Sequence, residues 1–393
     1  MKNWLTKDVL LISLSAFFAD AGYQALIAGF PIFLVLYLKA PVYYLGIAMA
    51  LAYGVGSIFA YYGGKLSDRH SKKKIAILGN IMIPILSFTG FASFAAEATA
   101  IFSAGWWARN FRTPARRAMI GDISSKLDKA RVYGFLNALD VGGGIVAVAY
   151  LSIGIYLGVA LKLIFLITAI PILISSLCLF LVSYKGIPNR KNIGKNAISS
   201  IKTATKRAKA KAGAYKGVIL ATGIYGLSFY SLSFPVLTIA QESNDFYGVL
   251  SYGVFLFISA IVGYIAGVYA KKIVRNLAVF GYFLAGIGSL IIGISYHFGL
   301  GIIASYIGIF VIGIAVGTIE TLEPTIVSLA RSKINSGSGM GALTSSRSIG
   351  LFIANLALGF LYVIGPLYAY GFAAIMAILA GVVLLLFGFN SKI

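Results

Sequence analysis

Long apolar segments recur along almost the whole chain and are separated by short polar stretches. Twelve of them are close to the length of about 20 residues that crosses a bilayer as a helix. They lie at about 8–38, 42–62, 75–95, 98–119, 131–158, 161–184, 216–240, 247–270, 277–297, 299–325, 338–363 and 366–389. The pattern predicts an all-α integral membrane protein with twelve transmembrane helices.

The first apolar segment also imitates a signal peptide. Lys2 and Lys7 precede it, and small residues flank Asp20 in the manner of a cleavage site. The apolar stretch nevertheless continues to Leu38, which is too long for the apolar region of a signal peptide. We therefore expect a retained helix.

Composition agrees with a membrane protein and leaves little for catalysis. Of 393 residues, 59% are hydrophobic and 11% are charged, whereas soluble domains carry about 25% charged residues. One cysteine excludes a disulfide within the chain, and two histidines offer little for a metal or nucleophilic site. The chain has no Gly-x-x-x-x-Gly-Lys-Ser/Thr loop for ATP. We expect no enzyme activity, no cofactor and no metal.

The basic residues lie almost entirely on one side of the predicted spans. Of the 33 lysines and arginines, Arg109, Arg112 and Arg347 lie within spans, Lys39 and Lys162 lie in outside loops, and the other 28 lie inside. This is the positive-inside distribution of a multi-pass protein. It excludes nucleic acid as the reason for the net charge of +22. We expect a cytoplasmic-membrane protein with both termini in the cytoplasm.

One long polar connection divides the chain. The stretch from Lys185 to Lys216 holds ten bases and no acid, with apolar positions at helical spacing. It predicts a linker at 186–215 between two six-helix units at 1–185 and 216–393. It also fits a basic amphipathic helix on anionic membrane lipids, and the two interpretations are compatible.

The two halves share landmarks at nearly constant offsets. Gly134 and Asp140 recur as Gly341 and Arg347 at an offset of 207, and other landmarks recur at 203 and 210. The others are the polar segments 64–72 and 267–275, and Pro114 with Pro324. Such a repeat is expected of a secondary transporter built from duplicated halves.

The polar loop after the second span resembles the loop signature of the major facilitator superfamily. The matching residues are Gly64, Asp68, Arg69, Lys72 and Lys73. Ser71 stands where the signature usually has glycine. With twelve spans and the basic linker, the resemblance covers the whole chain. It implies two pseudo-symmetric six-helix bundles that rock about a central cavity.

The resemblance also implies a role for this loop. In the family, the aspartate at the position of Asp68 lies against the positive end of the eleventh helix, from the other half. An anion there gains about 0.3–1 kcal/mol, or ~2 if partly buried. We therefore predict that the loop, with Asp68 as the acting group, is a conformational latch on the cytoplasmic side.

Charged residues inside the spans are functional candidates because each costs about 2.5–3.5 kcal/mol on insertion scales. At 1.5 Å per residue, Arg112 and Asp140 lie roughly 10 and 13 Å from the cytoplasmic end, and Glu323 and Arg347 roughly 12 and 13 Å. Two ion pairs are predicted, with reversed charge order. One interpretation is that these pairs lock neighbouring helices together. The other is that Asp140, Glu320 or Glu323 is a proton site, because a carboxylate that alternates between apolar and basic surroundings binds and releases a proton.

Asp20 is the leading candidate for proton coupling. It lies near the middle of the first span, with no obvious base at its depth, and Gln24 follows one turn along the same face. The alternative is a neutral aspartic acid that is hydrogen-bonded to a neighbouring helix.

Further polar and aromatic residues are candidates for the substrate cavity. Arg109 would hold an anionic substrate, or merely pack against the neighbouring tryptophans. The aromatic residues before Pro235 would line a cavity around a kink, or merely pack. The candidates are Gln24, Arg109, Asn137, Tyr225, Phe229 and Tyr230.

These observations predict a monomeric secondary transporter of a small organic solute or drug-like compound, driven by protons. A facilitative uniporter and a lipid scramblase or channel-like protein are the alternatives, although a scramblase needs neither latch nor duplicated halves. Gly142, Gly143 and Gly144 favour close helix packing. The segment lacks the Gly-Pro of the family's antiporter motif, so antiport is not indicated.

Overall fold

The computed structural model describes residues 4–124, 129–184, 205–228, 232–330 and 336–388, and all their regular secondary structure is helical. The first half forms α1 (Lys7–Ile32), η1 (Phe33–Tyr37), α2 (Val42–Met49), η2 (Ala50–Val55), α3 (Gly56–Arg69), α4 (Lys72–Met82), η3 (Ile83–Phe91), α5 (Ala95–Ile123), α6 (Lys129–Tyr156), α7 (Leu161–Ile167) and α8 (Ala169–Leu181). The second half forms α9 (Thr205–Ser228), α10 (Ser233–Glu242), α11 (Asp245–Phe298), α12 (Ile302–Ala330), α13 (Ser336–Ile364) and α14 (Pro366–Gly388). The π-helical η1 and η2 and the 3-10 helix η3 continue the helices beside them.

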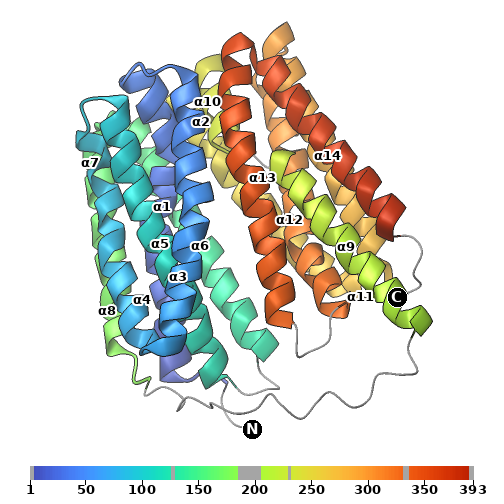
Figure 1. Cartoon of the computed structure of the whole chain (residues 1–393). Helices are drawn as coiled ribbons and strands as arrows, with labels where there is room; N and C mark the ends of the chain where they lie inside the picture. Colours follow the sequence, from blue (N-terminus) through green and yellow to red (C-terminus); the bar gives the residue numbers. More distant parts are fainter. Residues whose placement is uncertain (1–3, 125–128, 185–204, 229–231, 331–335, 389–393) are drawn as a thin grey trace.

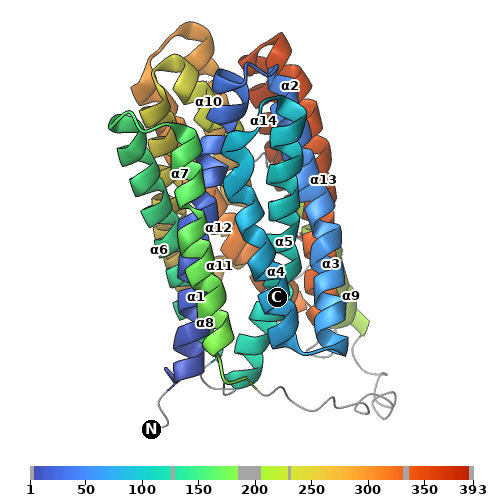
Figure 2. The same ribbon diagram turned by 90° about the vertical axis from the view of Figure 1, so that its left-hand side faces the viewer.

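The helices form two bundles that lie side by side. Figure 1 shows α1 to α8 on the left and α9 and α11 to α14 on the right, with α10 behind α2 near the top, and Figure 2 views the first bundle from outside. We call the lower end of both views, where α3 joins α4, the basic end, and the upper end the far end. The chain reverses at the far end through residues with positive φ, three of them glycines, which have no Cβ to clash. These residues are Lys39, Gly158, Gly299 and Gly301.

Eleven segments of the described chain are long and apolar enough to cross a membrane. The remaining predicted span corresponds to α5, a helix of 29 residues that packs between α3, α4 and η3. The arginines of α5 lower its hydropathy, and three of them, Arg109, Arg112 and Arg116, form polar contacts that are described below. The seventh predicted span is divided, because α9 ends at Ser228 and α10 begins at Ser233. Pro235 therefore lies in the first turn of α10, where proline is tolerated.

The eighth and ninth predicted spans are joined differently from the prediction. The polar segment 267–275 is helical, and α11 is continuous over 54 residues. A straight helix of that length would measure about 81 Å, far more than the roughly 30 Å apolar core of a bilayer. Gly263 and Gly281 both pack against α12, facing Gly317 and Ile319. The two arms of α11 therefore run back along the same helix, and the repeat of the first-half loop is a helical bend.

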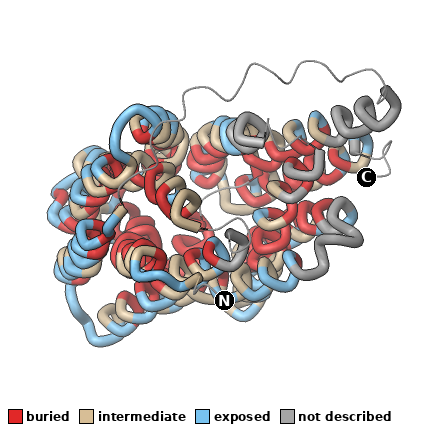
Figure 3. The backbone as a smooth tube through the Cα atoms, turned by 90° about the horizontal axis from the view of Figure 1, so that it is seen from below, coloured by how far each residue is buried: buried red, intermediate tan, exposed pale blue. Residues whose placement is uncertain are grey.

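The buried apolar side chains of the described residues form three clusters. One cluster extends through both halves, and includes Phe30 from α1 and Leu237 from α10. The other two lie at the basic end and are each confined to one half, around Met119 in the first and Ile326 in the second. Seen from the basic end, the buried residues gather inside each bundle (Figure 3). The halves thus share a core toward the far end and have separate cores at the basic end.

Close helix contacts join the halves toward the far end. A Cβ on Gly46 would lie 2.4 Å from the Asn355 carbonyl oxygen and 2.8 Å from Gly359 Cα, so α2 and α13 pack backbone to backbone. At the surface, Tyr37 Oη donates a hydrogen bond to Asp245 Oδ2 at 3.2 Å. These contacts close the space between the halves on that side.

Candidate functional site

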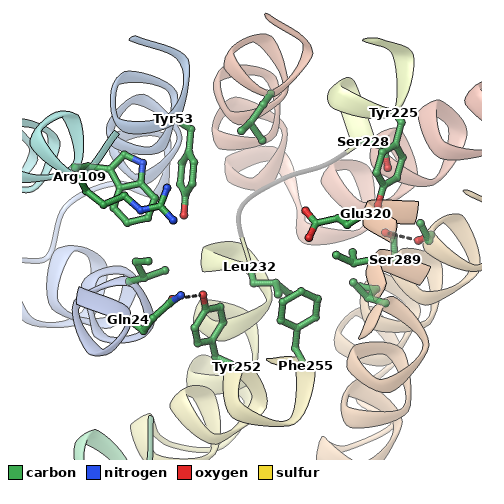
Figure 4. A pocket seen from close by; sticks show the side chains of 16 residues that line it. Gln24, Tyr53, Arg109, Tyr225, Ser228, Leu232, Tyr252, Phe255, Ser289 and Glu320 are labelled. Carbon is green, nitrogen blue, oxygen red and sulfur yellow. Dashed lines mark hydrogen bonds between the residues drawn. The ribbon is translucent and has the colours of Figure 1, made fainter. Parts of the chain in front are cut away.

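A cavity lies between the two bundles and is lined by both. Its volume is about 240 Å³. The lining comes from α1, η2 and α5 in the first half, and from α9, Leu232, α11, α12 and α13 in the second (Figure 4). Three predicted cavity residues, Gln24, Arg109 and Tyr225, are part of it. Asn137 is exposed on α6 and is not among these lining residues, so its place in the cavity stays a prediction.

Two further predicted lining residues, Phe229 and Tyr230, lie outside the described part of the chain. The cavity is also lined by residues that were not predicted to line it, notably Tyr53, Tyr252 and Trp106, one of the tryptophans beside Arg109. An aromatic side chain in a membrane helix is usually a packing residue, so nothing in the sequence alone distinguishes these three.

Arg109 extends from α5 into the cavity between aromatic rings. Its guanidinium carbon lies 4.8 Å from the ring centroid of Trp106 and 5.3 Å from that of Tyr23. Both contacts are cation–π interactions, which are strengthened where water is excluded. Nη1 donates a hydrogen bond to Asn110 Oδ1 at 3.2 Å, and Nε is buried without a partner. Among the described residues, no carboxylate forms an ion pair with Arg109.

Glu320 faces Arg109 from the other half. It is the cavity-lining end of a network in which Arg347 on α13 bonds both Glu320, at 3.3 Å, and Glu323. Glu323 is fully buried and accepts a hydrogen bond from Tyr282 Oη at 2.5 Å. The side chain of Glu320, by contrast, is 51% exposed. Two carboxylates thus share one guanidinium, and the excess negative charge is available at Glu320.

The ion pair of the first half differs from the prediction. Asp140 Oδ1 accepts a hydrogen bond from Arg116 Nη2 at 3.1 Å, whereas Arg112 Nη1 donates to Asn80 Oδ1 at 2.7 Å. The cause is the length of α5, which continues to Ile123 instead of ending near residue 119. Arg116 therefore lies roughly 10 Å from the end of the helix, the depth predicted for Arg112.

Arg112 instead forms part of a buried polar cluster inside the first half. Asn80 on α4 accepts from Arg112 and donates through its amide nitrogen to Ser175 at 3.2 Å and Ser176 at 2.7 Å on α8. Arg112 itself is fully buried. These hydrogen bonds tie α4, α5 and α8 together.

Asp20 is connected to the second half through Gln24. Gln24 Nε2 donates to Asp20 Oδ1 at 3.1 Å, and Tyr252 Oη on α11 donates to Gln24 Oε1 at 2.8 Å. Asp20 is 4% exposed. The expectation that no base shares its depth is wrong, because Arg109 and Arg116 both act electrostatically on it, as does Asp140. These neighbours come from α5 and α6, which the sequence alone could not place.

The residues of the predicted latch hold the loop to its own bundle. Lys72 forms an ion pair with Asp122 at 2.6 Å, and Lys73 donates to the carbonyl oxygens of Phe180 and Val182. Gly64 packs next to Pro114 of α5. Asp68 and Arg69 are exposed at the end of α3, so the contact with the other half stays a prediction.

Within the described residues, no group of three or more histidine, cysteine, aspartate or glutamate side chains is arranged to hold a metal ion. The arrangement is that of a binding cavity between two half-molecules, with an arginine on one wall and a glutamate on the other.

Transporters are among the solved structures that share this architecture. A D-xylose-proton symporter is 12% identical, with a TM-score of 0.79 and complete coverage of both chains. A POT family transporter in complex with 5-aminolevulinic acid is 13% identical, with a TM-score of 0.75 over 97% of this chain and 96% of that one. The inward open conformation of the xylose transporter XylE from E. coli is 15% identical, with a TM-score of 0.73 over 98% and 96%.

The likeness to these structures concerns the fold, because the identities are low. A comparison with curated proteins found no match. The sequence profile of the Major Facilitator Superfamily matches residues 12–354, which include the loop signature, the cavity lining and the helices from α1 into α13. The chain therefore belongs to the major facilitator superfamily.

Proposed function

We propose that the protein is a secondary active transporter that moves a small organic solute by alternating access and couples this movement to protons through Asp20. The single observation that carries the proposal is the hydrogen-bonded chain from Asp20 through Gln24 to Tyr252. It connects a buried carboxyl group of one half to the other half at the wall of the cavity.

The arrangement of the cores supports alternating access. The halves share one apolar core toward the far end and have separate cores at the basic end. Two rigid units joined in this way can rock about the cavity, and the far-end contacts must open when the basic end closes. The latch at Asp68 belongs to that second state in this proposal, and the basic end is the cytoplasmic side.

The chemistry of Gln24 supports proton coupling. When Asp20 is ionised, it accepts from the amide NH₂ group, so the amide oxygen remains free to accept from Tyr252. Protonation of Asp20 removes the charge from the acceptor of this hydrogen bond and thereby weakens it. Binding of a proton therefore loosens the hold of Asp20 on Gln24, the residue that forms the contact with Tyr252.

The size of the cavity favours a small solute over a large drug-like compound. Pockets for drug-sized ligands measure about 300–1,000 Å³, and this one is smaller. A uniporter is the alternative within the same fold. A scramblase fits less well, because the lining of the cavity is drawn from both bundles and its charges face each other.

The test is solute-driven proton movement in proteoliposomes loaded with a pH-sensitive dye. Sugars, nucleosides, amino acids and short peptides are added class by class, and a class that moves protons is then tested for accumulation under an imposed pH gradient. We expect Asp20→Asn to abolish accumulation and to retain exchange of labelled for unlabelled solute. Asp8→Asn, in the first turn of the same helix, is the matched control and should accumulate solute like the wild type.

Two results would contradict the proposal. Accumulation by Asp20→Asn at the wild-type level removes Asp20 from the coupling mechanism. Equilibration without accumulation by the wild type, at any pH gradient, identifies a uniporter.

A further inference from the structure

The two charged residues that face each other across the cavity indicate what it binds. We propose that the cavity binds a zwitterion, a molecule whose carboxylate pairs with Arg109 and whose ammonium group pairs with Glu320. This inference rests on the proposed function, since it names the class of solute that the transporter carries.

The first step of the argument concerns the charge of each wall. On the second-half wall, Arg347 is shared by Glu320 and Glu323, which leaves one negative charge in excess. On the first-half wall, the three arginines Arg109, Arg112 and Arg116 outnumber the two carboxyl groups of Asp20 and Asp140. Arg109 itself forms no ion pair with a carboxylate among the described residues. The cavity is therefore positive on one side and negative on the other.

The second step concerns how the two charges are placed. Figure 4 shows the Arg109 guanidinium and the Glu320 carboxylate on opposite walls, each directed toward the space between them. A single ion has only one of these groups to pair with. A ligand with both charges satisfies both walls, and desolvating each wall without a partner is costly.

The third step uses the repeat. At the offset of 207, Arg109 corresponds to Val316 and Glu320 corresponds to Thr113. The charges that hold helices together occur in both halves, but the two that face the cavity each occur in one half only. Arg109 and Glu320 are thus additions to the repeated framework, which is expected of groups that serve an asymmetric ligand.

The fourth step concerns the middle of the cavity. Between the charged walls, the lining is apolar or aromatic, and includes Ile27, Phe255 and Ile312. Such a surface accommodates a hydrocarbon or aromatic body. Free amino acids with apolar side chains and short apolar peptides share the required chemistry, and the volume of about 240 Å³ limits the peptide to a small one.

Binding to the purified full chain in detergent tests this inference without requiring transport. The first probes are the twenty standard amino acids and a set of apolar dipeptides. Two derivatives of each binder are then tested: the C-terminal amide, which lacks the carboxylate, and the N-acetyl derivative, which lacks the charged amine. Trp106 lines the cavity, so its fluorescence reports binding, and a rise in melting temperature confirms it. We expect each analogue to bind at least about tenfold more weakly, because each leaves one charged wall unpaired.

Two variants assign each end of the ligand. Arg109→Gln should weaken binding of the zwitterion and remove its advantage over the amide. Glu320→Gln should remove its advantage over the N-acetyl derivative. Arg109→Lys should keep the advantage over the amide, which separates a lost charge from a misfolded site. Glu97→Gln, at the far-end start of α5, is the control and should leave all affinities unchanged.

The outcomes separate this inference from the proposed function. No binding by any amino acid or dipeptide, or analogues that bind as well as the zwitterion, overturns the inference. Accumulation of an uncharged sugar or nucleoside without zwitterion binding also overturns the inference, but it leaves the proposed transporter function intact. Zwitterion binding without proton-driven accumulation supports the inference and contradicts proton coupling.

Discussion

Arg116 and Glu323 occupy equivalent positions in the two halves, 207 residues apart, and carry opposite charges. Each is bonded to the residue 24 positions later: Arg116 to Asp140, and Glu323 to Arg347. The ion pair between α5 and α6 is thus repeated between α12 and α13 with its polarity reversed. Since the pairs lie at equivalent sites in both halves, we interpret them as devices that hold neighbouring helices together.

This interpretation predicts coupled effects on stability. Asp140→Asn should lower the melting temperature, because it leaves the almost fully buried Arg116 without its charged partner. Adding Arg116→Gln should restore part of the loss, with a coupling energy of about 0.5–3 kcal/mol in a double-mutant cycle. The measurement is thermal unfolding in detergent.

The partly exposed pair Lys72–Asp122 provides the matched control. Its own cycle should give about 0–1 kcal/mol, as is usual for exposed pairs. Equal coupling energies for both pairs would contradict a structural role for the buried one.

The repeat also shows which parts of the fold and of the ion pairs could be predicted from the sequence. Segment length and hydropathy predicted the helices well, because a bilayer requires that each crossing be long and apolar. The choice of Arg112 over Arg116 failed because it depended on where α5 ends, and helix ends are the least reliable part of such a prediction. The offset of 207 was present in the sequence and would have selected Arg116.

Other parts of the site could not be predicted in this way. Tyr252 and Tyr53 are aromatic residues in apolar segments, and only the packing of the two bundles brings them to the cavity. The basic neighbours of Asp20 likewise come from other helices. Tertiary structure, rather than local pattern, determines which of many similar side chains face the space between the halves.

The close approach of α2 and α13 predicts that Gly46 keeps the far end closed. Gly46→Ala places a Cβ 2.4 Å from the Asn355 carbonyl oxygen, which forces the helices apart. The distance between spin labels attached at Lys162→Cys and Tyr368→Cys, in a Cys178→Ser background, should therefore lengthen or broaden.

Gly371→Ala is the control for this measurement, because a Cβ there has no neighbour within 4 Å. It should leave the distance distribution unchanged. An unchanged distribution in Gly46→Ala as well would show that this contact does not hold the far end together.

The predicted latch is tested by labelling the space that it is expected to close. Ser345 is exposed on α13 near the basic end, so Ser345→Cys in the Cys178→Ser background provides a reporter. Asp68→Asn should increase its reaction with a membrane-impermeant thiol reagent, because loss of the charge favours the state that is open at the basic end. Equal reactivity with and without Asp68→Asn, under conditions that drive the basic end closed, would count against the latch.

The hydroxyl of Tyr252 should matter more for coupling than for folding. Tyr252→Phe removes the hydrogen bond to Gln24 between the halves, at a cost of about 0.5–1.5 kcal/mol in the state that contains it. Asp20 then no longer influences α11 through Gln24, so solute accumulation should become less dependent on the pH gradient while solute exchange continues.

Tyr150→Phe is the matched control, since Tyr150 Oη donates to the Ala21 carbonyl oxygen at 2.8 Å within one half. Both variants lose a hydrogen bond to α1, but only the first should alter the number of protons moved per solute. If both variants transport protons and solute in the wild-type ratio, the connection between the halves is not the coupling device, and the proton route must use another carboxylate of the cavity.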